Sequence, residues 1–213
     1  MSQSPMRVAV FDYGAGNLHS LVKTLTGADR AVRIETDARA AVVDTDVLVL
    51  PGVGAFAPAA ERLADGRDAM RAAILNGLPT LGICLGMQLL FDASDEGAGL
   101  GLGVIPGRVT RLEAKRLPQI GWNRLDDVQD ALFGESGLNI AYYANSFACR
   151  PLDAGLVTAW STHDGDRFPA AVRRGLCVGV QFHPEKSSAP GVRFVESFLA
   201  AARTHSLSTV VTR

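Results

Sequence analysis

Apolar runs and longer mixed stretches alternate regularly along the first 91 residues of the chain. The apolar runs predict strands and the intervening stretches predict helices: strands at 7–12, 32–35, 46–50 and 79–83, and helices at 18–27, 57–63, 68–75 and 85–91. Strands that alternate with helices form a parallel sheet that is covered on both faces. Functional loops gather at the carboxyl ends of such strands, so we expect the loops after Asp12, Leu50 and Ile83 to lie together.

The pattern changes after residue 97. Short segments typical of strands follow at 108–113, 120–125, 139–147, 156–161, 168–173 and 177–182. They predict an antiparallel addition in the C-terminal half that returns to the main sheet and delivers His183 at a strand end. An amphipathic helix at 192–205 closes the chain. The fold class is therefore α/β, with a central, mostly parallel sheet and helices on both faces. We expect one domain at 1–205 and a mobile tail at 206–213, which has little to bury.

Composition narrows the classes of function. The chain has 213 residues, and its hydrophobic content of 47% and charged content of 20% are ordinary for a globular domain. A net charge of −1 gives no electrostatic reason to expect binding to nucleic acid or to an anionic membrane. No apolar stretch is long enough for a membrane span, and the start lacks the features of a secretion signal. We therefore expect a cytoplasmic protein.

The cysteines differ in their surroundings. Cys84, Cys149 and Cys177 are too widely spaced for a disulfide framework or a zinc motif, and no metal or cofactor is expected. Cys149 and Cys177 lie in strand-like runs, where small core residues are the simpler interpretation. Only Cys84 lies in a predicted turn.

Cys84 stands between a predicted strand and a predicted helix, in the sequence GICLGMQ at 82–88. This is the context of a nucleophile elbow, with cysteine where esterases have serine. The flanking Gly82 and Gly86 would provide space, because side chains there would clash in so tight a turn. The start of a helix also favours the reactive thiolate. A buried structural cysteine is the alternative, and the segment described next makes it the weaker one.

A base and a carboxylate occur in the sequence QFHPEK at 181–186. His183 and Glu185 are two residues apart, and an extended segment would point both side chains to one face. Pro184 favours that conformation at His183. Glu185 could then orient the imidazole and stabilise its charged form, which completes a Cys-His-Glu acyl-transfer site.

The sequence PGVG at 51–54 is a candidate oxyanion loop. Acyl transfer needs backbone N–H donors aimed at the developing oxyanion, usually one after the nucleophile and one from a nearby strand-end loop. Glycines at 52 and 54 permit the backbone conformations of such a loop. A plain turn would explain the motif taken alone, but its place one strand before the elbow favours the functional interpretation.

Taken together, these motifs resemble those of the class I (triad) glutamine amidotransferases. Within that family, further segments resemble the glutaminase subunits of imidazole glycerol phosphate synthases: DYGAGN at 12–17, LPGVGAF at 50–56, LPQIGWN at 117–123, FPAAV at 168–172 and QFHPEKS at 181–187. The resemblance extends from residue 7 to about residue 202. One departure is Asn145, at a position where the family often has histidine.

The resemblance implies that Cys84, His183 and Glu185 hydrolyse L-glutamine through a glutamyl thioester. It also implies roles for residues around the triad. Gly52, Gln88 and Ser146 would hold the glutamine, and Val53 and Leu85 would offer oxyanion N–H groups. For Gln88, a solvent-facing helix position is the alternative.

A partner is implied by the same resemblance. It is a (β/α)8-barrel cyclase subunit, with which the chain would form a heterodimer that makes imidazole glycerol phosphate and an aminoimidazole carboxamide ribonucleotide for histidine biosynthesis. Asn17, Trp122, Tyr142 and Lys186 match interface positions of the family. For Lys186 a solvated surface lysine is nearly as good an explanation, whereas an exposed tryptophan such as Trp122 is common at interface hot spots.

Other functions remain open at this point. The chain could serve another ammonia-using synthase, for anthranilate, carbamoyl phosphate or pyridoxal phosphate; the Gly-Val-Gly and Gly-Trp-Asn segments argue against these. It could be a Cys-His peptidase or related hydrolase on a similar elbow. It could also be a binding module that kept the fold, although all three members of the triad are present.

Overall fold

The structure is a computed structural model of the chain, and it describes residues 4–14 and 18–211. The strands are β1 (Met6–Phe11), β2 (Arg30–Glu35), β3 (Val47–Leu50), β4 (Thr80–Ile83), β5 (Ala93–Ser94), β6 (Gly107–Arg111), β7 (Gln119–Arg124), β8 (Ile140–Asn145), β9 (Phe147–Pro151), β10 (Val157–His163), β11 (Asp166–Arg174) and β12 (Cys177–Val180). The α-helices are α1 (His19–Leu25), α2 (Phe56–Leu63), α3 (Arg67–Leu75), α4 (Leu85–Leu89), α5 (Ala131–Ser136) and α6 (Ser188–Val211).

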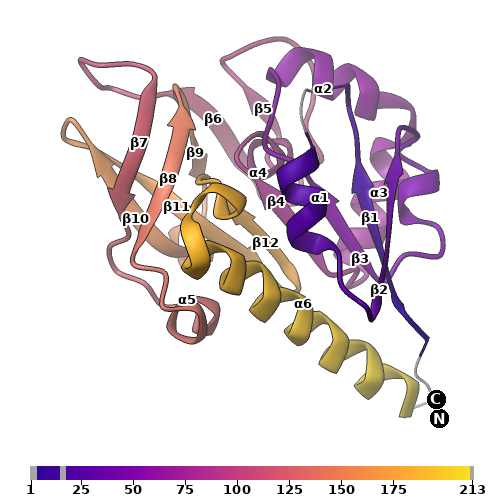
Figure 1. The fold of residues 1–213 in the computed structure, drawn as a ribbon. Coiled ribbons are helices and arrows are strands. Elements are labelled where there is room, and N and C mark those ends of the chain that lie inside the picture. The colour runs from indigo at the N-terminus through magenta and orange to yellow at the C-terminus, as the bar shows by residue number, and fades with distance from the viewer. Residues whose placement is uncertain (1–3, 15–17, 212–213) are drawn as a thin grey trace.

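A seven-stranded sheet forms the centre of the molecule, in the order β10-β11-β12-β4-β3-β1-β2 (Figure 1). The five strands from β12 to β2 run parallel to one another, whereas β11 pairs antiparallel with both β12 and β10. The predicted α/β class is thus confirmed. The C-terminal half returns to the sheet through β12, which pairs with β4 in a register that sets Val180 beside Ile83.

Helices cover both faces of this sheet because its buried strands direct alternate side chains to opposite sides. In β1, Val8 and Val10 belong to one core cluster, which includes residues of α1 and α6. Ala9 and Phe11 belong to the other, which includes residues of α2 and α3. In Figure 1, α1 and α6 lie in front of the sheet, and the long α6 runs from the middle of the molecule to the lower right of the view.

The C-terminal half differs from the prediction in several elements. The expected strand at 139–147 is two strands that separate at Ser146: β8 pairs with β7, and β9 pairs with β6. The pattern did not predict β5, which has only two residues, or α5. Helix α5 is short, but Asp130 accepts a hydrogen bond from Leu132 N at its start and Gly137 ends it at φ 69°. Those are ordinary capping signals.

Several helix boundaries also differ. Helix α1 ends at Leu25 rather than residue 27, and α4 ends at Leu89 rather than residue 91. Helix α6 spans Ser188–Val211 rather than residues 192–205. Pro190 and Gly191 look like helix breakers in the sequence, but proline is tolerated in the first turn. Gly191 is needed there because a Cβ atom would lie 2.6 Å from Cβ of Ser187. The expected mobile tail at 206–213 stays a prediction.

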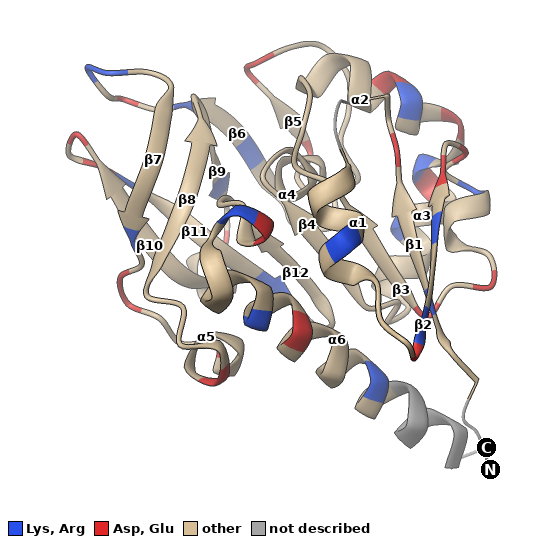
Figure 2. Cartoon of the chain, viewed as in Figure 1, with Lys and Arg blue, Asp and Glu red and all other residues tan. Residues whose placement is uncertain are grey.

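The carboxyl ends of β1, β3, β4 and β12 meet at one edge of the sheet, since these strands run in the same direction. Charges of both signs are interspersed along the described chain, as the blue and red segments of Figure 2 show. None of the described helices is both long enough and apolar enough to cross a membrane.

Candidate active site

Cys84 occupies a strained turn between β4 and α4. Its φ of 47° and ψ of −103° lie outside the regions that ordinary residues favour. The chain can turn so sharply because no side chain stands at Gly82 or Gly86. A Cβ atom at Gly82 would lie 2.7 Å from the carbonyl oxygen of Gly86, and one at Gly86 would overlap the backbone of Leu50. The steric role predicted for the two glycines is confirmed.

His183 and Glu185 follow β12, the strand beside the elbow. Nδ1 of His183 lies 2.9 Å from Oε1 of Glu185. The predicted extended segment is correct for His183, with φ −102° and ψ 95°, but wrong for Glu185. Pro184 begins a short 3-10 turn at Pro184–Lys186, closed by the bond from Ser187 N to Pro184 O. The turn still brings the carboxylate back onto the imidazole because it is so tight.

The charge on His183 is stabilised by its neighbours. Only 2% of His183 is exposed, and burial by itself lowers the pKa of an imidazole. Hydrogen bonds and charge interactions with Cys84 and Glu185 outweigh burial and raise the pKa of His183 to about 9. At neutral pH the ring is therefore an imidazolium held between a sulfur atom and a carboxylate. Such an arrangement can give a proton to a leaving group.

A cavity of about 370 Å³ opens over Cys84 and His183. Its lining includes six residues for which the sequence suggested a role in the site or at the interface: Gly52, Val53, Leu85, Gln88, Ser146 and Lys186. The lining also includes residues for which the sequence suggested no role, among them Glu96, Pro118 and Asn145. Glu96 is the lining carboxylate, and its Oε2 also accepts a hydrogen bond from Phe56 N at 3.1 Å. It lies in the loop after β5, where no predicted element pointed to the site.

Gln181 contacts Cys84, the candidate nucleophile, although the sequence suggested no role for Gln181. Its Nε2 lies 3.4 Å from Sγ of Cys84, and its Oε1 lies 3.4 Å from Nε2 of Gln88. Gln88 also donates to the carbonyl oxygen of Phe147 at 3.3 Å. Gln181 is fully buried. A buried glutamine two residues before His183 could have been noticed, since alternate residues at a strand end share a face.

The candidate oxyanion loop is held at its first residue. The carbonyl oxygen of Pro51 accepts hydrogen bonds from Gly86 N at 3.1 Å and from the hydroxyl of Tyr13. A Cβ atom at Gly52 would lie 2.9 Å from Cε1 of His183, so the loop passes directly against the imidazole. Gly54 has φ 114°, which an L-residue rarely adopts.

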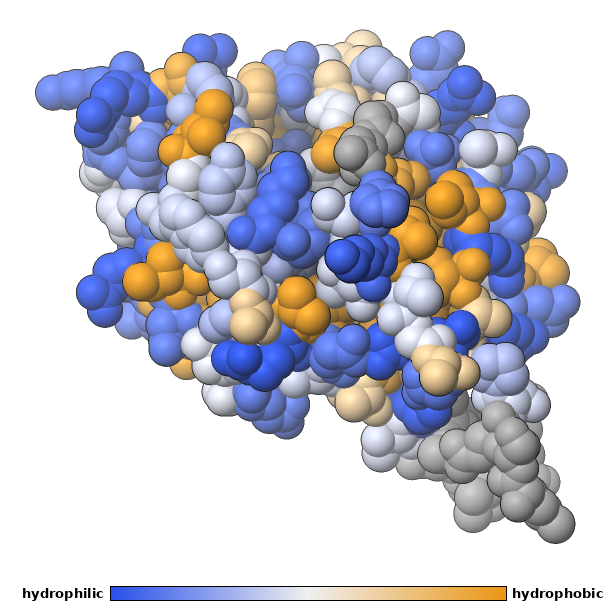
Figure 3. All heavy atoms as spheres, viewed as in Figure 1, coloured by the Kyte–Doolittle hydropathy of each residue, from blue (hydrophilic) through white to orange (hydrophobic). Residues whose placement is uncertain are grey.

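The expected interface residues are distributed over two places. Trp122 is 54% exposed on β7, and its ring meets that of Tyr142 on β8 edge-on, at 6.1 Å between centroids. Ile120 and Ile140 on the same two strands are 67% and 48% exposed, and Figure 3 shows orange hydrophobic atoms over β7 and β8. Lys186 is exposed and lines the cavity. Asn17 lies outside the described residues.

The remaining cysteines are core residues, as predicted. Cys149 and Cys177 are free and buried in β9 and β12. Burial raises the pKa of Cys177 to about 12 and raises the pKa of Cys149 well above its ordinary value. Both thiols are therefore protonated and unreactive at neutral pH.

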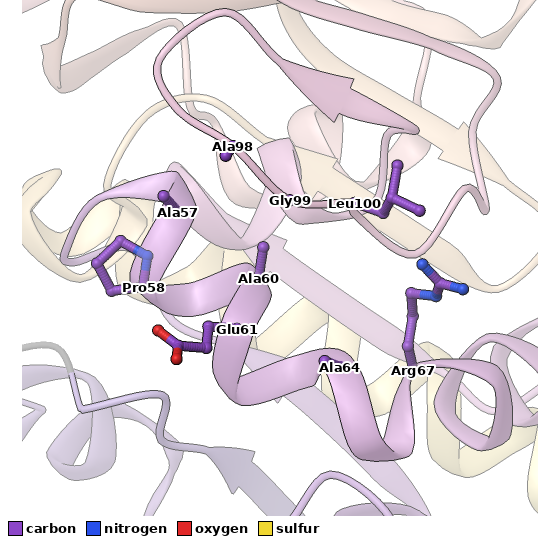
Figure 4. Close-up of a pocket in the computed structure, with 9 residues that line it drawn as sticks. All are labelled: Ala57, Pro58, Ala60, Glu61, Ala64, Arg67, Ala98, Gly99 and Leu100. Carbon is purple, nitrogen blue, oxygen red and sulfur yellow. The ribbon is translucent and has the colours of Figure 1, made fainter.

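A second hollow of about 430 Å³ lies between α2 and the loop at 98–100 (Figure 4). Small side chains form most of its wall, including Ala57, Ala60 and Ala64, with Glu61 and Arg67 at its edges. Neither Cys84 nor His183 lines it. The candidate catalytic residues thus lie on the first cavity and not on this hollow.

Comparison with known proteins agrees with this geometry. The model of the family "Glutamine amidotransferase class-I" matches residues 9–202. The chain is 42% identical to imidazole glycerol phosphate synthase subunit HisH of Microcystis aeruginosa, over 90% of this chain and 94% of that one. It is 39% identical to the subunit of the same name from Gloeothece citriformis, over 94% and 99%.

Solved structures share the fold at lower identity. A crystal structure described as glutamine amidotransferase matches with a TM-score of 0.71 and 21% identity, over 92% of this chain and 98% of that one. PurLQS from Thermotoga maritima matches with a TM-score of 0.67 and 20% identity, over 93% and 99%. At these identities the likeness concerns the fold alone.

Proposed function

The chain belongs to the class I glutamine amidotransferase family and is a glutamine amidotransferase, and from this premise we propose that it is the glutaminase subunit of an imidazole glycerol phosphate synthase. One observation carries the proposal: Cys84, with its strained backbone, and His183 line the same cavity. Nδ1 of His183 is held by Oε1 of Glu185 at 2.9 Å. Identity near 40% with the named subunits, over nearly their whole length, selects this synthase among those that use ammonia.

The proposed reaction begins with attack of Cys84 Sγ on the side-chain carboxamide carbon of L-glutamine. The carbonyl oxygen becomes an oxyanion, for which we propose two donors, the N–H groups of Val53 and Leu85. Leu85 is the first residue of α4, so its N–H has no partner within the helix. The N–H of Gly86 is already bonded to Pro51 O, which excludes it from this task.

His183 then supplies the proton that lets ammonia leave. Its raised pKa keeps it protonated near neutral pH, and Glu185 holds the ring in place as the proton departs. Expulsion of ammonia leaves a glutamyl thioester on Cys84. Neutral His183 next takes a proton from water, which attacks the thioester and releases glutamate and the free thiol.

The rest of the cavity would recognise the amino-acid end of the substrate. Gly52, Gln88 and Ser146 line it and are proposed to hold the glutamine. Glu96 is the lining carboxylate and suits the positively charged α-ammonium group. This role for Glu96 comes from the cavity rather than from the sequence.

Ammonia must reach a second active site before water protonates it. We propose a (β/α)8-barrel cyclase subunit as the partner in a heterodimer, with Asn17, Trp122, Tyr142 and Lys186 at the interface. Trp122 and Tyr142 present an exposed aromatic pair, which is typical of interface hot spots. A cytoplasmic location is part of the proposal, since all three cysteines are free, as is usual in a reducing compartment.

The test is glutamate release from L-glutamine by the purified chain, alone and mixed with the cyclase subunit. Mixing with anthranilate, carbamoyl phosphate and pyridoxal phosphate synthases separates the proposal from its nearest rivals. The expected result is activation by the cyclase subunit and no activation by the others. Activation by another synthase, or hydrolysis of peptides without hydrolysis of glutamine, would overturn the assignment.

A further inference from the structure

Asn145, the last residue of β8, carries a buried acceptor with no partner. It is 5% exposed and lines the cavity over Cys84. Its Nδ2 donates to the carbonyl oxygen of Phe147 at 3.0 Å. Its Oδ1 has no hydrogen-bond partner within the described part of the chain. A buried amide oxygen without a donor costs free energy, so a donor is expected to reach Oδ1 when the site is occupied.

The orientation of the Asn145 amide follows from its surroundings. The reversed amide would set Oδ1 against the carbonyl oxygen of Phe147, and two acceptors would face each other. Nε2 of Gln88 also donates to the carbonyl oxygen of Phe147, at 3.3 Å, and this oxygen therefore accepts from both side chains. Oδ1 of Asn145 is therefore the free end of the side chain, and only a hydrogen-bond donor can satisfy it.

We propose that Oδ1 of Asn145 binds the α-ammonium group of the substrate and so helps to select an α-amino acid. This inference rests on the proposed function, which makes glutamine the substrate. An ammonium group has three N–H donors, and the residues that line the cavity include Asn145, with its unpartnered buried amide oxygen, and the carboxylate of Glu96. The α-carboxylate has only acceptors, so Asn145 Oδ1 repels it.

A rival explanation comes from Gln119 on β7. Its Oε1 is also buried without a partner in the described chain, and Gln119 is the register partner of Asn145. One buried water could donate to both oxygens. Asn145 would then stabilise the end of the β7–β8 ribbon and would have no direct part in binding. The two explanations differ in how Asn145 and Gln119 affect substrates with and without an amino group.

The experiment compares L-glutamine with glutaramate, which has the same carbon chain without the α-amino group. The kcat and KM values of both are measured for the full chain with its cyclase subunit, as wild type and as Asn145→Leu. We expect Asn145→Leu to lower kcat/KM for glutamine about tenfold or more, mainly through KM, because a hydrogen bond to a charged group is lost. Values for glutaramate should stay near those of the wild type.

The matched control is Asn123→Leu. Asn123 also donates its amide to a backbone carbonyl, that of Thr162 at 2.9 Å, but it is half-buried and does not line the cavity. This variant should leave both substrates unaffected. Equal losses for glutamine and glutaramate in Asn145→Leu would overturn the assignment, as would no loss for either. The same loss for glutamine in Gln119→Leu would favour the bridging water.

Calorimetric binding of the two ligands to Cys84→Ala and to Cys84→Ala/Asn145→Leu repeats the comparison without turnover. If the wild-type complex binds glutamine but does not hydrolyse it, the proposed function fails while the binding comparison still decides the role of Asn145. If hydrolysis occurs and Asn145→Leu does not discriminate between the ligands, only the role of Asn145 fails.

Discussion

The loops after β3 and β4 lie side by side in the site, yet they are held in different ways. The elbow after β4 is fixed by close packing on both sides of Cys84: side chains at Gly82 and Gly86 would meet backbone atoms of the elbow and of Leu50. The loop after β3 is held at its start, where the carbonyl oxygen of Pro51 accepts from Gly86 N and from the hydroxyl of Tyr13, and where Gly52 packs against His183 and Ile83. Exposure rises along that loop toward Gly54.

This difference suggests a division of labour. A nucleophile needs the same geometry at all times, and the close-packed backbone around Cys84 keeps the elbow in one conformation. The proposed oxyanion donors would be needed only when ammonia has a use, and a loop with glycines at 52 and 54 can change a peptide orientation at low cost in free energy. The elbow should therefore determine whether the chain is an enzyme, and the loop should determine when it is active.

The largest expected effect comes from Cys84→Ala. Glutamate release in the complex should fall at least about 10³-fold, because the nucleophile is lost, while the melting temperature and pairing with the cyclase stay close to wild type. The control is Cys149→Ala, which should keep the activity but lower stability by roughly 1 kcal/mol through lost burial. A tenth of the activity surviving in Cys84→Ala would remove that residue from the mechanism.

The next effect concerns the loop after β3. The isolated chain should release glutamate about 10²–10³ times more slowly than the complex with the cyclase ligand bound, which is the typical cost of one missing oxyanion donor. Contacts from the partner would favour the orientation in which the Val53 N–H points at the oxyanion. Glutamate production is measured for the chain, the complex and the liganded complex. Equal rates in all three would contradict control by this loop and leave the glutaminase assignment intact.

A third experiment compares single methyl groups in the loop. Gly52→Ala places a Cβ atom 2.9 Å from Cε1 of His183 and from Cγ2 of Ile83. We expect a loss of kcat of about tenfold to 10²-fold, since small displacements of catalytic groups cost that much. A matched change is Gly134→Ala in α5, where a Cβ atom meets nothing within 4 Å; it should leave kcat unchanged. Wild-type activity in Gly52→Ala would show that the loop does not constrain the imidazole.

The smallest expected effect is a shift in pH dependence. Activity that needs the His183 imidazolium should fall as the pH rises through about 9. Glu185→Gln removes an interaction that raises this pKa, so the falling limb of kcat/KM should move to lower pH. If the falling limb of the kcat/KM profile is at the same pH in Glu185→Gln as in wild type, the limb reports the titration of a group other than His183.

The same shift has a consequence for stability. A pKa that folding raises from 6.5 to about 9 stabilises the folded chain fully below pH 6.5, and this contribution is lost as the pH rises through 9. Chemical denaturation at several pH values should show the decline in wild type, and a smaller decline in Glu185→Gln.

Much of the fold and of the site could be predicted from sequence because their causes are local. The alternation of strands and helices determined the parallel sheet, and glycines around Cys84 determined the elbow, since only glycine fits so close an approach. The same local reasoning found His183 and Glu185, although it assigned Glu185 to an extended segment and the structure has a 3-10 turn there. Pro184 restricts the residue before it more strongly than the residue after it.

Tertiary structure alone decided the features that depend on residues far apart in the chain. Gln181 reaches Cys84 only because β12 lies beside β4, and Glu96 and Asn145 reach one cavity from separate parts of the chain. The raised pKa of His183 likewise depends on burial and on two neighbours whose distances no sequence pattern gives. Steric limits on the backbone and the spacing of hydrophobic residues depend on neighbouring positions in the chain, so the sequence shows them directly. The pairing of distant strands decides which side chains meet and how much water they exclude.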